Sequence, residues 1–209
     1  MEPFDVLDAV AVPLAVAKID TGMIVPARFH RQRRRPGVSD YARAFLHDLR
    51  HDAAGTPRPE CALNDARYAG ARILVAGADF GCGSSRESAA YAVLDYGLRA
   101  LVASSFGDVF AGNCLQNGIL PVVLPEATVQ RLLRLLEAQP GARVRVDLPA
   151  QQVRLPDGSS HGFDIDPTRK ERLARGLDDV GVTLTHLPQI EAFEQQYLVA
   201  RPWLRCYPG

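Results

Sequence analysis

The sequence predicts an α/β fold with a central, partly parallel sheet, βαβ units and an antiparallel β appendage. Two patterns along its 209 residues indicate this class. Between residues 72 and 139, short apolar runs alternate with stretches of helical periodicity, which is typical of βαβ units and a parallel sheet. After residue 141, apolar and polar residues alternate with a period of two, which predicts antiparallel strands. The length fits one domain, so we expect residues 1–209 to form a single unit.

The first 70 residues give weaker signals than the rest of the chain. Residues 9–12 and 15–19 have the apolar character of two strands, and residues 39–50 have the spacing of a helix. Pro57 and Pro59 then interrupt regular structure. We therefore expect two strand-like pieces and one helix before the βαβ units.

The middle of the chain carries the clearest signals. Apolar runs predict strands at residues 72–76, 99–103 and 119–124, and helical spacing predicts helices at residues 84–96, 106–116 and 127–139. Ser84 with Glu87, and Ser105 with Asp108, have the spacing of a capping box, in which two side chains satisfy free N–H groups at a helix start. These pairs predict that the first two helices begin beside Ser84 and Ser105.

The last third of the chain predicts a meander followed by helices. Val144, Val146 and Leu148 alternate with charged residues. Residues 151–155 then lead through the turn sequence Pro-Asp-Gly-Ser to residues 161–165, which predicts a hairpin. Pro167 suits the first turn of a helix, which we expect to continue through residues 169–177. A final helix is expected at residues 189–198.

Composition and charge argue against several classes of protein. The formal net charge is zero, which disfavours a general electrostatic attraction to nucleic acid. The N-terminus lacks the pattern of a signal peptide, and no apolar run approaches the length of a membrane span, so we expect a cytoplasmic protein that binds no membrane. Cys61, Cys82, Cys114 and Cys206 are scattered without a C-x-x-C pair. We therefore expect this chain to hold no zinc and no iron–sulfur cluster by itself.

One turn has the features of an anion site. Residues 77–87 read Gly-Ala-Asp-Phe-Gly-Cys-Gly-Ser-Ser-Arg-Glu and lie between a predicted strand and a predicted helix. Free N–H groups and the helix dipole favour an anion there, and the planar guanidinium of Arg86 matches a carboxylate. The run lacks the G-x-G-x-x-G, P-loop and G-x-S-x-G patterns, which disfavours nucleotide binding and serine hydrolysis. Two interpretations remain: Ser84 is a base beside a bound carboxylate, or it only caps the helix.

Several motifs, taken in order, resemble one known family. They are Ile19-Asp-Thr-Gly-Met-Ile-Val-Pro26, Asp79-Phe-Gly-Cys-Gly-Ser-Ser-Arg-Glu87, Leu94-Asp-Tyr-Gly-Leu-Arg-Ala100, Ser105-Phe-Gly-Asp-Val-Phe110 and Asn113-Cys-Leu-Gln-Asn-Gly-Ile-Leu-Pro121. Over nearly its whole length the chain resembles the small subunit of 3-isopropylmalate dehydratase, which corresponds to the swivelling domain of aconitase. The resemblance implies a swivelling β/β/α domain.

The resemblance also implies a reaction and a partner. The family is a heterodimeric hydro-lyase that interconverts 2-isopropylmalate and 3-isopropylmalate by dehydration and rehydration, in leucine biosynthesis. A 4Fe–4S cluster is held by the family's large subunit, and its iron acts as a Lewis acid on the departing hydroxyl. By this resemblance the chain binds no cofactor itself and is active only with the large subunit. It would close over the cluster and complete the site for a small hydroxy-dicarboxylate substrate.

Matching positions carry the family's residue roles onto this chain. Ser84 corresponds to the catalytic base, and Ser85 and Arg86 correspond to groups that hold the substrate. Asp20 and Thr21 correspond to further substrate-binding positions. A serine hydroxyl is a very poor base near neutral pH, so this role requires an adjacent cation, helix N–H groups and exclusion of water. The resemblance therefore predicts half of an active site at residues 77–87.

Two departures from the family pattern lie close to these residues. Ser88 stands where the family usually has a histidine. This change is either drift around an unchanged site or a new hydrogen-bond partner that accompanies a different substrate. Gly22 stands where the family usually has an aspartate, which makes the role of Asp20 in orienting the site less certain.

An arginine-rich segment is the third departure. It is either solvated surface or a loop facing the part of the substrate that varies between enzymes. An inward arginine would favour a methylmalate-, homoaconitate- or aconitate-like acid, because a buried guanidinium needs a partner. The candidate specificity loop contains Arg28, Arg31, Arg33 and Arg34. A rival of another class is a non-catalytic module that binds carboxylates, or nucleic acid through residues 28–35, although the zero net charge leads us to expect no nucleic-acid partner.

Overall fold

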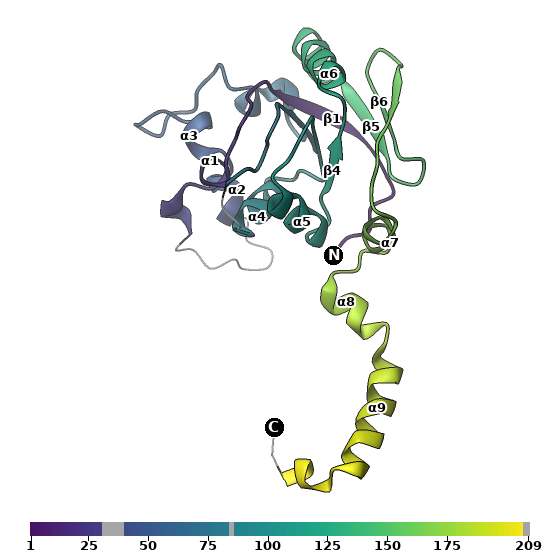
Figure 1. The fold of residues 1–209 in the computed structure, drawn as a ribbon. Coiled ribbons are helices and arrows are strands. Elements are labelled where there is room, and N and C mark those ends of the chain that lie inside the picture. The colour runs from purple at the N-terminus through teal and green to yellow at the C-terminus, as the bar shows by residue number, and fades with distance from the viewer. Residues whose placement is uncertain (31–39, 84–85, 207–209) are drawn as a thin grey trace.

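The computed structural model describes residues 1–30, 40–83 and 86–206 (Figure 1). In this part of the chain one sheet has the strand order β4-β3-β2-β1-β5-β6-β7. The strands are β1 (Val6–Leu14), β2 (Ile73–Ala76), β3 (Ala100–Ala103), β4 (Leu120–Val123), β5 (Arg143–Asp147), β6 (Gln152–Arg154) and β7 (Ser160–Gly162). Strands β1 to β4 pair in parallel, whereas β5, β6 and β7 continue the sheet in antiparallel pairs. The structure confirms the predicted α/β fold with a partly parallel sheet and an antiparallel appendage.

The described helices surround this sheet and form the C-terminal end of the chain. They are α1 (Thr21–Ile24), α2 (Asp40–Ala44), α3 (His47–Arg50), α4 (Ser88–Asp95), α5 (Asp108–Gln116), α6 (Glu126–Ala138), α7 (Pro167–Arg175), α8 (Asp179–Leu184) and α9 (Leu187–Ala200). Short 3-10 turns include η1 (Ala27–Phe29) and η4 (Pro202–Cys206). Within the described ranges, every helix is too short or too polar to cross a membrane.

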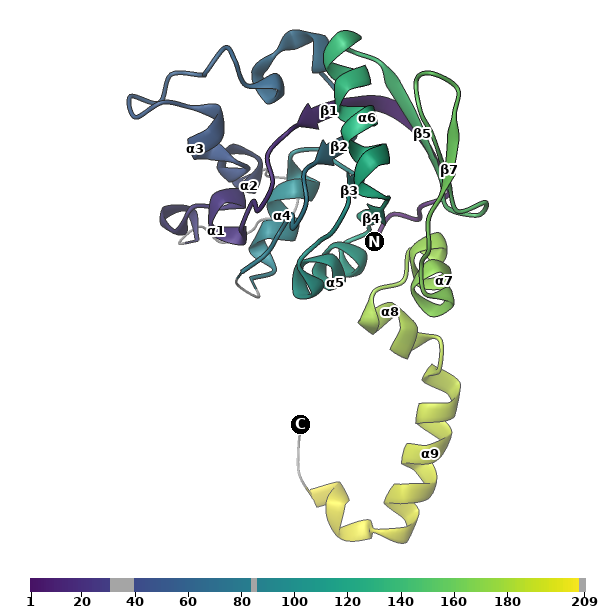
Figure 2. The ribbon, with the colours of Figure 1, turned by 45° about the horizontal axis from the view of Figure 1, so that its top comes forward.

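Helices cover both faces of the parallel strands (Figure 2). Helix α6 packs on one face with Ile73 and Val75 of β2. Helices α4 and α5 lie on the opposite face with Leu74 and Ala76. Successive side chains of a strand point to opposite faces, so a strand covered on both sides is apolar throughout. All residues of β2 and β3 are accordingly buried.

Strand β1 joins the parallel and antiparallel parts of the sheet. Its first half pairs with β5 in an antiparallel ladder, and its second half pairs with β2 in parallel. The prediction of a second strand at residues 15–19 is wrong, because the chain leaves the sheet after Leu14. Lys18 has a φ of 56°, in the left-handed region, which is incompatible with a strand.

The predicted starts of the first two central helices are also wrong. Helix α4 begins at Ser88, and Glu87 precedes it without a side-chain cap; the carboxylate of Glu87 accepts a hydrogen bond from Asn117 instead. Helix α5 begins at Asp108, after Gly107. The hydroxyl of Ser105 donates to Asp79 Oδ1 over 2.7 Å and so leaves the helix uncapped. In each predicted capping box, one described side chain forms a hydrogen bond with a residue far away in the sequence instead of capping its own helix.

The remaining helix predictions were partly correct. The helix expected at residues 39–50 is divided into α2 and α3 by Leu46, which has a φ of 48°. Helix α7 begins at Pro167 as predicted and ends at Arg175, two residues earlier than predicted; Gly176, whose φ is 67°, caps it. Helix α9 is longer than predicted, and α8 was not predicted. Both extend away from the sheet in Figure 1.

Candidate active site

The turn after β2 follows a path that only glycine allows at key positions. At Gly77 an added Cβ atom would lie 2.7 Å from the carbonyl oxygen of Val16, which is closer than van der Waals contact permits. At Gly81, where φ is +75°, it would lie 2.1 Å from the ring of Phe110 on α5. The turn is therefore packed tightly against neighbouring parts of the chain.

A second loop, which follows β3, lies beside this turn. The backbone N–H of Phe80 donates to the carbonyl of Ser105 over 3.2 Å, and the N–H of Gly107 donates to the carbonyl of Phe80 over 3.0 Å. Ser105 also bonds both the backbone and the carboxylate of Asp79. Both loops leave the carboxyl ends of parallel strands, where open α/β sheets bind their ligands.

The segment around Asp20 forms the third side of the site. The N–H of Thr21 donates to the carbonyl of Cys82 over 3.0 Å, and Asp20 pairs with Cys82 as an isolated β-bridge. Thr21 is buried, with 2% of its surface exposed. The carboxylate of Asp20 accepts the N–H of Met23 over 2.8 Å and so caps α1. The structure thus brings Asp20 and Thr21 beside the 77–83 turn, although Asp20 also has a structural role.

Gly22 fits the geometry of this cap. A Cβ atom added at Gly22 would lie 3.1 Å from Oδ1 of Asp20, the oxygen that accepts the hydrogen bond from Met23. A side chain at this position would therefore press on the Asp20 carboxylate. The glycine leaves that carboxylate room in its capping position.

A histidine lies between Arg86 and Ser88. Arg86 Nη1 is 3.0 Å from His30 Nε2, and Ser88 Oγ is 3.2 Å from His30 Nδ1. Burial lowers the pKa of His30, and the positive charge of Arg86 lowers it further. The imidazole that the Ser88 hydroxyl contacts comes from the residue that follows η1.

Sequence reasoning gave His30 no role. It lies 56 residues from Arg86 and 58 from Ser88, so no local pattern relates the three. The replacement of histidine at position 88 was the one available signal, and it did not identify where another imidazole would come from.

Arg28 is bonded to α3. Its Nη1 donates to Asp48 Oδ2 over 3.0 Å, and its Nη2 lies 3.1 Å from His47 Nδ1. The hydrogen bond from Arg28 is the largest influence that lowers the pKa of Asp48, to about 2. Both side chains of the ion pair are more than half exposed. The other predicted residues, Ser84, Ser85, Arg31, Arg33 and Arg34, lie outside the described part of the chain.

The described cysteines do not gather. Cys61, Cys82 and Cys114 are free thiols, and burial raises the pKa of Cys114, which packs in the core beside Phe110. In the described ranges, no group of three or more His, Cys, Asp or Glu side chains is placed to hold a metal ion. These residues do not fit a four-iron cluster, which requires several thiolates around one point.

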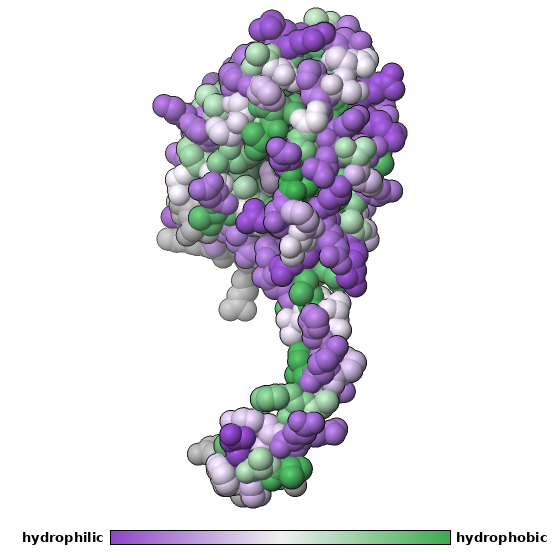
Figure 3. All heavy atoms as spheres, turned by 45° about the vertical axis from the view of Figure 1, so that its right-hand side comes forward, coloured by the Kyte–Doolittle hydropathy of each residue, from purple (hydrophilic) through white to green (hydrophobic). Residues whose placement is uncertain are grey.

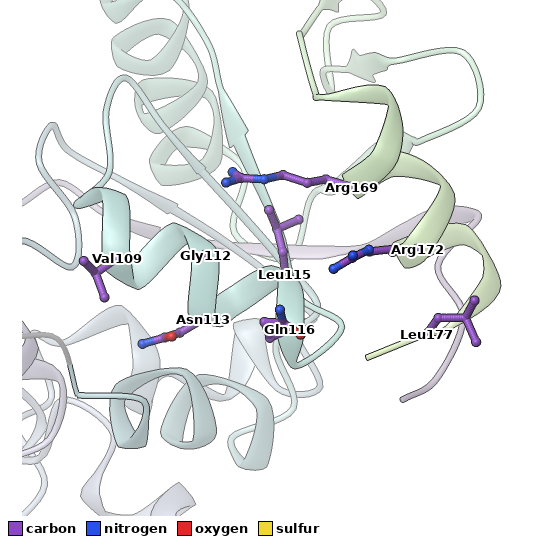
Figure 4. Close-up of a pocket in the computed structure, with 8 residues that line it drawn as sticks. All are labelled: Val109, Gly112, Asn113, Leu115, Gln116, Arg169, Arg172 and Leu177. Carbon is purple, nitrogen blue, oxygen red and sulfur yellow. The ribbon is translucent and has the colours of Figure 1, made fainter. Parts of the chain in front are cut away.

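A separate hollow of about 420 Å³ lies between α5 and α7 (Figure 4). In the figure Arg169 and Arg172 extend from α7 toward Leu115 on α5. Arg172 and Gln116 both bond the carboxylate of Asp179 at the start of α8, over 2.9 and 2.8 Å. None of the predicted substrate residues that the structure describes lines this hollow, so it is distinct from the site at the strand ends.

Comparison with known proteins identifies the family. The model of the aconitase C-terminal domain matches residues 1–127, the LeuD_N model matches residues 130–167, and the model of the C-terminal domain of the 3-isopropylmalate dehydratase small subunit matches residues 179–205. The chain is 44% identical over 203 residues to the 3-isopropylmalate dehydratase small subunit of Rhodospirillum centenum, covering 97% of this chain and 98% of that one. The chain belongs to the 3-isopropylmalate dehydratase small-subunit family. Another member, from Phenylobacterium zucineum, is 47% identical over 98% of each chain.

A solved structure supports the same fold for this family member. The chain resembles the crystal structure of 3-isopropylmalate dehydratase from Methanocaldococcus jannaschii with a TM-score of 0.65, over 90% of this chain and 99% of that one. The sequences are 23% identical, so this likeness concerns the fold. The name small subunit, which the curated relatives share, implies a large-subunit partner.

Proposed function

We propose that this chain is the small subunit of 3-isopropylmalate dehydratase, a hydro-lyase of leucine biosynthesis. The observation that carries the proposal is the 44–47% identity, over 97–98% of this chain, to relatives with that name. The reaction removes and re-adds water across two adjacent carbons and so interconverts 2-isopropylmalate and 3-isopropylmalate. The fold supports it, because the predicted site lies at the carboxyl ends of the parallel strands.

Within this function we propose that Ser84 is the base that removes the proton beside a substrate carboxylate. Ser85, Arg86, Asp20 and Thr21 would hold the substrate. The contacts between Thr21 and Cys82 support this grouping, because they join the Asp20 segment to the turn that leads to these serines. The exposed guanidinium of Arg86 supports a carboxylate ligand, since its planar fork matches both carboxylate oxygens.

We propose that the large subunit is the obligate partner and holds the 4Fe–4S cluster. The scattered cysteines of this chain support that division. We call the region from residue 178 to 206 the arm. It carries large exposed apolar side chains, which support the proposal that the chain binds a partner subunit. A domain within a larger protein is held near its neighbours by the chain, whereas a separate subunit needs contacts of its own. The model of the C-terminal domain of the 3-isopropylmalate dehydratase small subunit matches residues 179–205, which is nearly the whole arm, whereas the aconitase model matches only residues 1–127.

Isopropylmalate is the substrate we favour over more polar acids. Arg28 already has a carboxylate partner in Asp48, so this arginine of the candidate specificity loop does not require a substrate carboxylate.

We further propose that residues 1–209 act as one swivelling unit. The free thiols suit the reducing environment of the cytoplasm, where we place the protein.

Reconstitution with the large subunit tests the proposal. The two chains should be co-expressed from the same genome, and turnover should be measured on isopropylmalate, methylmalate, homoaconitate and aconitate. We expect the highest kcat/KM on isopropylmalate. A higher value on another acid would change the substrate, and absence of turnover on all four with an intact cluster would overturn the function.

A further inference from the structure

The contacts of His30 fix the position of its protons. A guanidinium carries only donors, so Nε2 of His30 must accept the hydrogen bond from Arg86 and cannot carry a proton. A neutral imidazole with a free Nε2 has its proton on Nδ1, which then donates to Ser88 Oγ. The observed pair of contacts is therefore compatible with one form of the ring, neutral and protonated at Nδ1.

We infer that His30 is a positioning residue that holds the guanidinium of Arg86 in place for the substrate, with Ser88 fixing the imidazole tautomer. The inference rests on the proposed function, in which Arg86 binds a substrate carboxylate. His30 acts through Arg86 rather than on the substrate. Arg86 has a long side chain with considerable rotational freedom, so a partner that orients the guanidinium lowers the entropy lost when a carboxylate binds.

The arrangement depends on the charge of His30. A proton on Nε2 would remove the acceptor and place two positive groups 3.0 Å apart. Burial and the charge of Arg86 both lower the pKa of His30, so the ring stays neutral near pH 7. Other charged groups near η1 have partners of their own: Arg28, Asp48 and His47 contact one another. Protonation of His30 in acid should therefore release Arg86.

The tautomer can be observed directly in the full-length small subunit. Long-range ¹H–¹⁵N spectra of protein labelled at histidine, assigned with a His30→Gln variant, should show His30 protonated at Nδ1 at about pH 7.5. A ring protonated at Nε2, or at both nitrogens, would overturn the inference. This measurement does not need the cluster or turnover, so it remains valid if the proposed function fails.

Kinetics of the reconstituted pair test the consequence for the substrate. We expect His30→Ala to raise KM by roughly tenfold with little change in kcat, because a hydrogen bond to a charged group is lost. His30→Gln offers both an acceptor and a donor but cannot titrate. It should restore KM at neutral pH and abolish the rise in KM that we expect of the unaltered pair in acid, where His30 becomes protonated.

A matched control separates this role from a general effect of losing a histidine. His161→Gln, on β7 in the antiparallel extension, should follow the unaltered protein in KM and in its pH profile. The inference is wrong if His30→Ala leaves KM unchanged, or if His30→Gln keeps the same rise in KM in acid. If the unaltered pair does not turn over isopropylmalate at all, the proposed function fails and the spectra alone decide the role of His30.

Discussion

The sheet and the C-terminal arm use apolar side chains in opposite ways. Strands β2 and β3 are wholly buried between helices. Helices α8 and α9 of the arm have no buried residue, and Phe193 and Trp203 are 63% and 65% exposed. Figure 3 shows hydrophobic residues at the surface along this extension. An isolated helix of this length is only marginally stable in water. The sheet is therefore stabilised within the chain, whereas the arm has its apolar surface available for a partner.

The same substitution in both regions gives the largest contrast. Leu74 is fully buried on β2, so Leu74→Ala should lower the free energy of unfolding by about 2–5 kcal/mol through lost contacts and a cavity. Leu184, in the arm, is 57% exposed, and Leu184→Ala should change it by less than about 0.5 kcal/mol. Urea titrations of the isolated subunit measure both values. Equal losses would show that the arm is packed against the sheet in solution.

Substitutions in the arm should instead affect assembly. Phe193→Ser combined with Trp203→Ser should weaken association with the large subunit by about 2 kcal/mol or more, since aromatic side chains dominate many interfaces. Gln195→Ser, on α9 like Phe193, is the control and should leave affinity unchanged. Isothermal titration calorimetry measures the affinity. Unchanged affinity in the double variant, with α9 still helical, would remove the arm from the interface.

A small effect on stability is expected from the surface ion pair between Arg28 and Asp48, which lies outside the arm. Asp48 has its pKa lowered from 3.8 to about 2, first by the hydrogen bond from Arg28. A lowered folded-state pKa stabilises the protein above the unfolded value, and this stability is lost as the pH falls toward 2. Because the pair is exposed, Asp48→Asn should cost only about 0.2–1 kcal/mol at pH 7.

Unfolding at two pH values checks this sign. The difference between Asp48→Asn and the unaltered protein should become much smaller as the pH falls to about 2, because Asp48 is then protonated in the unfolded chain and about half protonated in the folded one. Glu60→Gln, whose carboxylate is 3.8 Å from Arg58, is a control with a looser ion pair. A difference that persisted in acid would mean that Asp48 acts through packing rather than charge.

Local patterns predicted the sheet well and the loops poorly. Strand β2 and helix α6 were placed within one residue, because a strand buried on both faces is an uninterrupted apolar run and a helix buried along one stripe has apolar residues at helical spacing. The start of α5 was missed because Ser105 bonds Asp79, 26 residues earlier. No local pattern contains such a contact.

The candidate site likewise contains residues that the local sequence indicated and a residue that it did not. The glycines and Arg86 indicated an anion-binding turn from local sequence, and this remains a prediction; the contact of Gly81 with Phe110 shows only that the turn has no room for a side chain there. The role of Ser84 came from family resemblance and remains a prediction. His30 was missed because its importance lies in contacts that only the fold brings together.

The most direct test of the central claim is the turnover number of the reconstituted pair that carries Ser84→Ala. Removal of a general base should lower kcat on isopropylmalate by at least about a hundredfold, with the fold and subunit association retained. Ser160→Ala, at an exposed position on β7, should leave kcat unchanged. Near-normal turnover in the Ser84→Ala pair would contradict the account and leave Ser84 without a catalytic role.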